Sequence, residues 1–380
     1  MFPTMASLAL RRQAPLYGLG VAAIVMIILP ASLFIWPAHP VPIAAGDHLV
    51  AHQDPIRNGT LGFQKIFAIN LPTRSDKRDN LILASALSNI HIEFVDGVTA
   101  DEVNPASYPY NWHTEFTQTE YGVRRAHINA MERIVEEGLG SALIIEDDAD
   151  WDVSLKTQLQ SFAHAVRALQ GADEAISPYG DAWDVLWMGH CGITCAEQAP
   201  YFMADSDPTV LPPSHFLPYW RDGPSIERAA DSRIICPVSD GVCMPFYAVS
   251  AVGARRLLSA LSVSPADVAG VVDSGAQIDV ALGRICGSGF LRCFAPYPSL
   301  TGGYRAAGPE NKGSDIHQAD AVGKVEIKPA WSWGVMYSVM MNVHRLLYGD
   351  GTVHANWEDL PVLDVDPHSI PVVGGQQFRV

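Results

Sequence analysis

Four carboxylates directly follow a short apolar run near the middle of the chain. Residues 142–145 (Ala-Leu-Ile-Ile) form a continuous apolar segment, which is typical of a strand buried on both faces. Glu146, Asp147, Asp148 and Asp150 come next. Carboxylates this close repel one another unless a cation or solvent compensates, and their oxygens suit Mg²⁺ or Mn²⁺ better than zinc. The alternatives are a solvated acidic turn and a calcium loop without a catalytic role.

The elements before this segment predict its place in an α/β sheet. Residues 65–71 form an apolar strand pattern, followed by a charged loop, a helical pattern over 79–87 and a second strand pattern over 91–95. This β–α–β order with short connections is typical of a doubly wound nucleotide-binding sheet, whose ligands lie at the carboxyl ends of the strands. A helix is predicted over 119–138, and it leads into the acidic strand.

The later part of the chain shows a similar mixture. The predicted helices and strands there are 155–169, 183–188, 241–249 and 254–261. Residues 190–239 are rich in Pro, Asp and Cys, which favours a long disulfide-pinned loop over the site, where an acceptor would be recognised. The apolar stretch 331–348 predicts a packed C-terminal helix.

The N-terminal region predicts a membrane anchor. Residues 16–36 contain no charged residue and are long enough to cross a bilayer as a helix. Arg11 and Arg12 precede them, which favours a cytoplasmic N-terminus and a type II orientation. A cleaved signal peptide is the alternative, and in both cases the rest of the chain faces a lumen or the outside. The whole chain has 380 residues and a net charge of −16, which argues against a nucleic-acid partner.

All six cysteines follow the apolar stretch. An even number of cysteines in an oxidising compartment predicts disulfides, whereas Cys191 and Cys195 could instead begin a zinc site. Asn58-Gly59-Thr60 is an N-glycosylation sequon, which is compatible with a luminal stem.

Several polar residues lie where they could contact a nucleotide. Arg74 and Arg78, after the first strand, could bind a diphosphate or could simply begin a solvated helix. Asp96, after the second strand, could accept a hydrogen bond from a ribose or base, or could close a turn. His127 lies in the helix before the acidic strand, where it is either a ligand contact or a structural residue.

Several segments, taken in order, resemble glycosyltransferase family 25, the group of lipopolysaccharide and collagen galactosyltransferases, and its fungal members in particular. The matching pieces run from about residue 66 to residue 316: Ile69-Asn70-Leu71-Pro72 with Arg74, Asp76 and Arg78; Phe94-Val95-Asp96-Gly97; His127; Leu143–Asp148; Tyr247–Ser250 with Gly253-Ala254; Ile278-Asp279; and Ser314-Asp315-Ile316. The family often has a Ser-His pair where this chain has Ala126-His127, a departure that would remove a hydroxyl contact to the nucleotide.

The resemblance implies a GT-A fold, which is a Rossmann-like nucleotide-sugar-binding α/β fold, behind the N-terminal transmembrane anchor. It also implies an Asp-x-Asp motif that binds Mn²⁺ (or Mg²⁺) together with a UDP-sugar donor. Asp148 and Asp150 flank one residue, so in an extended segment both would face the same cation. His317 is the expected third metal ligand.

The remaining site residues implied by the resemblance contact the donor or the acceptor. The expected donor contacts are Leu71, Arg74, Arg78, Asp96, His127 and Asp147. Asp315 and His317, in a glycine-rich loop, would close over the diphosphate. An inverting transfer needs a carboxylate base near the acceptor hydroxyl, and Asp279 is the expected base with Asp273 as its alternate.

The sequence therefore predicts a metal-dependent glycosyltransferase that moves a hexose, with galactose expected, from a UDP-sugar to a glycan or glycoprotein acceptor. The predicted organisation is a cytoplasmic tail (1–15), a signal anchor (16–36), a stem (37–63), a luminal GT-A domain (64–320) and a C-terminal helix and tail (321–380), held in the Golgi or another secretory membrane. Two alternatives stay open. One is a metal-dependent phosphohydrolase or nucleotidase, and the other is a non-catalytic carbohydrate- or calcium-binding ectodomain.

Overall fold

A computed structural model describes residues 41–42, 54–109, 117–172, 174–216, 223–263, 277–309, 312–316 and 326–379. The predicted anchor over 16–36 and two predicted site residues, Asp273 and His317, lie outside these ranges. Within the described ranges, every helix is too short or too polar to cross a bilayer.

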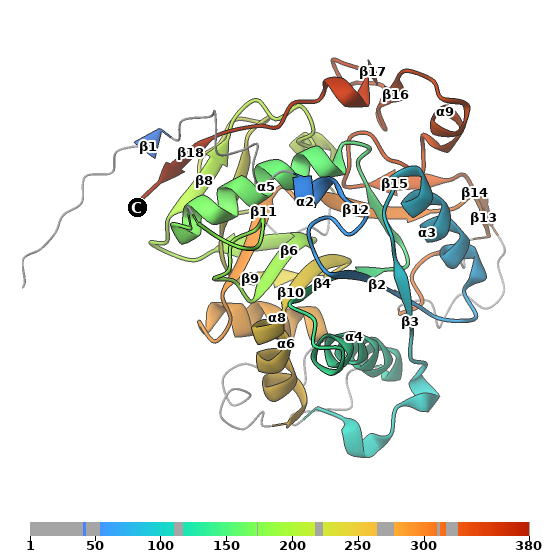
Figure 1. Cartoon of the computed structure of the whole chain (residues 1–380). Coiled ribbons are helices and arrows are strands. Elements are labelled where there is room, and N and C mark those ends of the chain that lie inside the picture. The colour runs from blue at the N-terminus through green and yellow to red at the C-terminus, as the bar shows by residue number, and fades with distance from the viewer. Residues whose placement is uncertain are drawn as a thin grey trace, which may run out of the picture. The chain divides into compact units, whose positions relative to one another are not determined.

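Most of the strands form one mixed sheet of 11 strands (Figure 1). Strand β2 (Lys65–Asn70) lies between β3 (Glu93–Asp96) and β4 (Ser141–Glu146), and it is parallel to both. Next to β4 comes the antiparallel strand β10 (Phe246–Ser250), followed by β6 (Val185–Gly189). The strands predicted from the apolar patterns around residues 65–71, 91–95, 142–145 and 183–188 are therefore confirmed within a few residues.

The other half of the sheet contains residues predicted to form a loop. Strand β11 (Cys293–Tyr297) is parallel to β6 and antiparallel to β9 (Arg233–Val242). Strands β7 (Gly192–Cys195) and β8 (Tyr201–Ala204) both pair with β9. The prediction of one long loop over 190–239 is wrong, because β7, β8 and most of β9 form in this stretch. Strands β7 and β8 each pair with β9, and β9 also pairs with β11. Two very short strands complete this edge of the sheet: β18 (Gln376–Phe378) and β1 (Val41–Pro42).

Helices cover both faces of the sheet, which explains the continuous apolar run in β4. Ala142 and Ile144 pack in one buried cluster with α4 (Gln118–Glu136), α6 (Ala251–Leu258) and α8 (Ile278–Gly287). Leu143 and Ile145 point the other way, into a cluster with α2 (Asp54–Arg57), α3 (Ser75–Leu87) and α5 (Leu155–Gln170). Burying one such side chain stabilises the fold by about 1.5–3 kcal/mol. The two apolar clusters therefore fix the register of β4.

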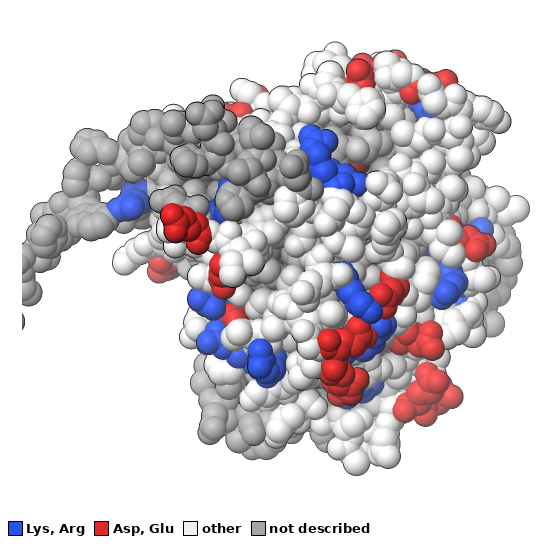
Figure 2. All heavy atoms as spheres, in the orientation of Figure 1, with Lys and Arg blue, Asp and Glu red and all other residues white. Residues whose placement is uncertain are grey.

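The start of α4 follows from its sequence. The Thr117 side chain and backbone exchange hydrogen bonds with the third residue of the helix, Glu120, and this capping box satisfies N–H groups that would otherwise be unpaired. The helix ends at Glu136, two residues earlier than predicted. In Figure 2, acidic and basic side chains are interspersed on the visible face. Ion pairs between β2, β3 and the end of α4 include those of Lys65 with Glu93 and Glu137.

A second, three-stranded sheet lies beyond the end of β4. It consists of β5 (Ala149–Trp151), β12 (Thr301–Arg305) and β15 (Trp331–Trp333). The predicted helix over 331–348 is largely wrong: Trp-Ser-Trp alternates with the period of a strand and pairs with β12, and only α9 (Val343–Tyr348) is α-helical. The remaining short elements are β13 (Gly308–Pro309), β14 (Ile327–Lys328), β16 (Val353–His354), β17 (Asp364–Val365), a π-turn at Ser259–Val263 and 3₁₀ turns at Ala100–Glu102, Pro105–Ser107, Pro213–His215 and Pro367–Ser369.

Three disulfides use all six cysteines: Cys191–Cys243, Cys195–Cys236 and Cys286–Cys293. The predicted disulfides are confirmed and the zinc alternative is wrong. Part of the predicted stem belongs to the folded core, since Ile56, Leu61 and Phe63 are buried. The whole is a mixed α/β structure around a central mixed sheet, which fits the expected Rossmann-like fold.

Candidate functional site

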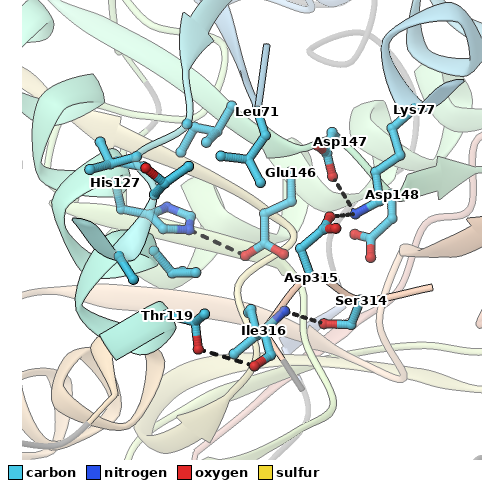
Figure 3. Close-up of a pocket in the computed structure, with 17 residues that line it drawn as sticks. Leu71, Lys77, Thr119, His127, Glu146, Asp147, Asp148, Ser314, Asp315 and Ile316 are labelled. Atoms are coloured by element: carbon cyan, nitrogen blue, oxygen red, sulfur yellow. Dashed lines mark hydrogen bonds and ion pairs between the residues drawn. The ribbon is translucent and has the colours of Figure 1, made fainter. Parts of the chain in front are cut away.

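Two adjoining cavities open at the carboxyl end of β4. The first has a volume of about 190 Å³ and lies between the ends of β2 and β4, the start of α4 and the loop 312–316 (Figure 3). The second has a volume of about 570 Å³ and extends toward α8, β12 and β15. Glu146 and Asp148 line both cavities, as do Ser314 and Ile316 of the loop. The acidic segment is thus the wall that the two cavities share.

The carboxylates in this wall have different surroundings because a turn at residues 147–148 separates β4 from β5. Asp147 accepts hydrogen bonds from Lys77 Nζ at 2.8 Å and from Asn70 Nδ2 at 2.9 Å. The Asp148 side chain has no hydrogen bond or ion pair with any residue that the structure describes, and it faces both cavities. Asp148 is therefore the carboxylate that is most available to a ligand.

Lys77 is a site residue that the sequence did not single out. It is buried on α3, and its Nζ lies 2.8 Å from Asp147 Oδ1 and 2.8 Å from Asp315 Oδ2 (Figure 3). Burial alone would lower the pKa of Lys77, but Asp148, Asp147 and Asp315 raise it above its ordinary value. Burial raises the pKa of Asp147, which Lys77 opposes and Asp148 reinforces. A fixed positive charge therefore lies at the floor of the first cavity.

The loop 312–316 is held against this cavity by several contacts. Asp315 forms ion pairs with both Lys77 and Arg74. The Thr119 hydroxyl, at the start of α4, donates to the Ile316 carbonyl at 3.1 Å. The prediction placed Asp315 in a loop over the donor, and the structure places it on the wall of the first cavity.

Three of the predicted donor contacts do not line either cavity. The Arg74 guanidinium is bound by Asp76 and Asp315 beside the first cavity. The Arg78 guanidinium lies 3.7 Å from the centre of the Phe94 ring. Asp96 is exposed at the end of β3. By contrast, the predicted contacts Leu71, His127 and Asp147 all line the first cavity.

His127 is buried and connects two elements of the site. Its Nδ1 lies 2.9 Å from the Tyr247 hydroxyl on β10, and its Nε2 lies 3.3 Å from Glu146 Oε1. Burial, together with the charge of Glu146, raises the pKa of Tyr247 well above its ordinary value, so this phenol stays protonated. A neutral imidazole can accept from Tyr247 and donate to Glu146, which fixes the orientation of that carboxylate. The neighbouring Ala126 lines the cavity without a hydroxyl group.

Asp150 does not join Asp148 in the cavities. Its side chain is fully buried and accepts hydrogen bonds from Trp151 N at 2.9 Å, from Ser332 Oγ at 2.7 Å and from Ser338 Oγ. Burial raises the pKa of Asp150 to about 6. The expectation that Asp148 and Asp150 face one cation is wrong, because the turn at 147–148 breaks the alternation of an extended strand.

Asp279 lies in the first turn of α8 and lines the second cavity. Its Oδ2 accepts from Cys243 N at 2.7 Å and its Oδ1 accepts from Val280 N at 2.9 Å. Cys243 has a φ of 60° and is bonded to Cys191, and both cysteines also line this cavity. Both oxygens of the expected base are thus oriented by backbone donors.

Known proteins resemble the part of the chain that builds the first cavity. Residues 63–183 match the model of glycosyltransferase family 25 (LPS biosynthesis protein). Residues 63–183, the family 25 segment, are therefore similar to this family. A similar relative is procollagen galactosyltransferase 1 of Danio rerio, 28% identical over 148 residues, which are 36% of this chain and 23% of that protein.

Of two further relatives, one is named a galactosyltransferase and the other is named inactive. Procollagen galactosyltransferase 2 of Mus musculus is 23% identical over 142 residues, 34% of this chain and 21% of that protein. The human protein named inactive glycosyltransferase 25 family member 3 is 25% identical over 146 residues, 35% of this chain and 23% of that protein. The matches thus span about a quarter of the length of these family 25 relatives.

The family 25 segment supplies nearly all of the first cavity. Outside it lie only the loop residues Ser314, Asp315 and Ile316. The second cavity combines a few residues of the segment with others from β12, β15, α8 and the Cys191–Cys243 disulfide, all beyond residue 183. The match to the family model therefore covers most of the first cavity and only a few residues of the second.

The residues of the two cavities fit a metal ion that is held partly by protein carboxylates and partly by a substrate. No group of three or more His, Cys, Asp or Glu side chains is placed to hold a metal within the ranges that the structure describes. Ions such as Mg²⁺ are commonly held by one or two carboxylates together with substrate phosphates and water. Asp148 and Glu146, which both line the two cavities, fit a cation that binds together with a diphosphate.

Proposed function

We propose that this protein is a hexosyltransferase that binds a UDP-sugar in the first cavity and transfers the sugar to an acceptor in the second. The observation that carries the proposal is the shared acidic wall, Glu146 and Asp148, between two adjoining cavities at the end of a family 25 strand. Galactose is the proposed sugar because two of the relatives are named galactosyltransferases.

The first cavity offers an apolar side and a charged end. Ile69, Leu71 and Val98 can pack against a nucleoside, while Lys77 and Asp148 lie where a diphosphate would carry its charge. A Mn²⁺ or Mg²⁺ ion bound with the diphosphate, with Asp148 among its ligands, would supply positive charge that stabilises the leaving group. Glu146, oriented by His127, would lie beside the bond that breaks.

The transfer proceeds by direct displacement in this proposal. Asp279 accepts the proton of the acceptor hydroxyl while the acceptor oxygen forms a bond to the anomeric carbon. The bond from that carbon to the diphosphate oxygen breaks, and UDP leaves with the electron pair. The anomeric configuration is inverted because attack and departure occur on opposite faces.

We also propose that the protein works in the secretory pathway, anchored by residues 16–36 in the Golgi or a related membrane. Three disulfides support an oxidising compartment, because such bonds are rare in the cytosol.

Calorimetric titration of the full chain with a panel of UDP-sugars, with Mn²⁺ and with chelator, tests this function. We expect one UDP-sugar to bind tightly only when the metal is present, and an acceptor to release UDP from it. Absence of binding to every UDP-sugar in both conditions would contradict the proposal. Release of inorganic phosphate from UDP would instead favour a nucleotidase.

A further inference from the structure

One wall of the second cavity carries an aromatic side chain that packs directly on a glycine backbone. Trp333 on β15 is paired in register with Gly303 on β12, and both line the cavity. A Cβ atom at Gly303 would lie 2.2 Å from the Trp333 ring, so any larger residue would displace the indole. The ring is therefore held in place by the strand beneath it.

A cation lies beside this ring. Arg305 is two residues beyond Gly303 on the same strand, and its guanidinium carbon is 5.5 Å from the centre of the Trp333 ring. Arg305 forms no ion pair or hydrogen bond with the residues that the structure describes, and its Nε is buried without a partner. A buried donor without a partner costs free energy that a ligand oxygen would recover.

The other polar groups of the cavity favour a neutral ligand over an anionic one. Four carboxylates line it, whereas Arg305 is the one cation among the lining residues described: the acids are Glu120, Glu146, Asp148 and Asp279. His190 adds no charge at neutral pH because burial lowers its pKa to about 4. Gln277 donates a hydrogen bond to Glu120, so an amide and a carboxylate lie side by side.

An aromatic ring with hydrogen-bond donors and acceptors around it matches the chemistry of a neutral sugar ring. The C–H face of a pyranose packs on an aromatic face, and its hydroxyls need fixed donors and acceptors around the edge. A volume of about 570 Å³ lies within the range of small-molecule sites, about 300–1,000 Å³. A single amino-acid side chain would leave much of it empty.

We propose that the acceptor of this enzyme is a neutral sugar residue, which stacks on Trp333 and is held at its edge by Arg305 and the Gln277–Glu120 pair. This inference rests on the proposed transferase function. Trp333, Arg305 and Gln277 lie outside the segment 63–183 that matches the family model, so the inference is drawn from the cavity and not from the family match.

Two measurements on the full chain test it. The first is UDP release from UDP-galactose in the presence of methyl β-glycosides of glucose, galactose and N-acetylglucosamine, or of a collagen-like peptide with hydroxylysine and no sugar. We expect at least one glycoside, and not the peptide, to stimulate release. The second is saturation-transfer NMR of the same glycosides, which detects their binding without any transfer.

Substitutions locate the binding site. Trp333→Ala should raise the KM for the glycoside at least tenfold and abolish its NMR signal, while the affinity for UDP stays unchanged. Trp333→Phe should restore part of the binding, and Arg305→Met should also raise the KM. Trp357→Ala is the control, because Trp357 packs on His215 with 4.6 Å between the ring centres and lines neither cavity. It should change the KM less than twofold.

The outcomes separate the two proposals. Stimulation by the sugar-free peptide, an unchanged KM in Trp333→Ala, or an equal rise in Trp357→Ala would overturn the sugar-acceptor site. Glycoside binding that depends on Trp333, without UDP release from any UDP-sugar, would overturn the transferase function and leave a sugar-binding site.

Discussion

The backbone N–H of Cys243 donates a hydrogen bond of 2.7 Å to Oδ2 of Asp279. Cys243 has a φ of 60°, a conformation that side-chain-bearing residues adopt rarely, and its disulfide to Cys191 helps to hold it there. The disulfide therefore acts on the proposed base through one backbone N–H group, and Cys243 is a positioning residue for Asp279.

Removal of this disulfide should reduce catalysis more than binding of the donor. In the double variant Cys191→Ala/Cys243→Ala we expect kcat to fall on the order of tenfold to a hundredfold, because small displacements of a catalytic group have effects of that size. The UDP affinity, measured by calorimetry, should stay unchanged. Cys195→Ala/Cys236→Ala is the matched control: both variants should lose about 2–4 kcal/mol of stability, but the control should keep its kcat. Equal losses of kcat would show that the effect is general destabilisation.

Asp148→Asn should abolish transfer without destabilising the protein. Its carboxylate forms no hydrogen bond or ion pair within the described ranges, so we expect the free energy of unfolding to change by no more than about 0.5 kcal/mol. Transfer should fall on the order of 10²- to 10³-fold if Asp148 stabilises the charge of the leaving group. Initial rates and urea unfolding measure the two effects. A fully active Asp148→Asn variant would remove Asp148 from the site.

Lys77→Met should destabilise the fold because it leaves Asp147 buried without its cation. Breaking a buried ion pair in this way costs about 3–5 kcal/mol, and the partial exposure of Asp315 places the expected value near the lower limit. The double variant Lys77→Met/Asp147→Asn should recover part of this loss, since the unpaired charge is gone. If urea unfolding shows the same loss in both variants, the two residues do not stabilise each other.

Asp150 should make stability fall as the pH rises toward neutrality. Its pKa is raised to about 6 in the folded protein by burial, above about 3.9 in an unfolded chain, so the folded state binds the proton more tightly. This contribution is complete below about pH 4 and is lost as the pH rises through about 6. Asp150→Asn mimics the protonated form and should remove a pH dependence on the order of 2–3 kcal/mol. Urea unfolding from pH 4 to pH 8 compares the two proteins, and parallel curves would contradict the assignment.

The sequence predicted the parts of the fold that depend on local pattern. The run Ala142–Ile145 identifies β4 because both faces of this strand are buried, and the acidic residues after it mark the site. Asp279, the predicted base, lines the second cavity, and its role as a base stays a prediction.

The missed features depend on contacts between distant segments. Lys77 appeared as one of several charges in a loop, and its role depends on how α3 packs against the end of β4. Asp150 was misplaced because a two-residue turn reverses the direction of its side chain, and its serine partners come from residues 332 and 338. Strands β7, β8 and β9 lie in a stretch rich in Pro, Asp and Cys and are defined by pairing across the sheet.

The position of β10 limits how this protein can be divided. It enters the sheet between β4 and β6, yet it comes from residues 246–250, beyond the segment shared with family 25. A fragment that ends near residue 183 would expose the edge of β4, whose residues 142–145 are apolar, and would lose Tyr247, the partner of His127. Bare apolar edges of this kind pair with other chains. The segment 63–183 is thus not expected to fold independently. A chimera that exchanges this segment between relatives would have to include β10 to remain soluble.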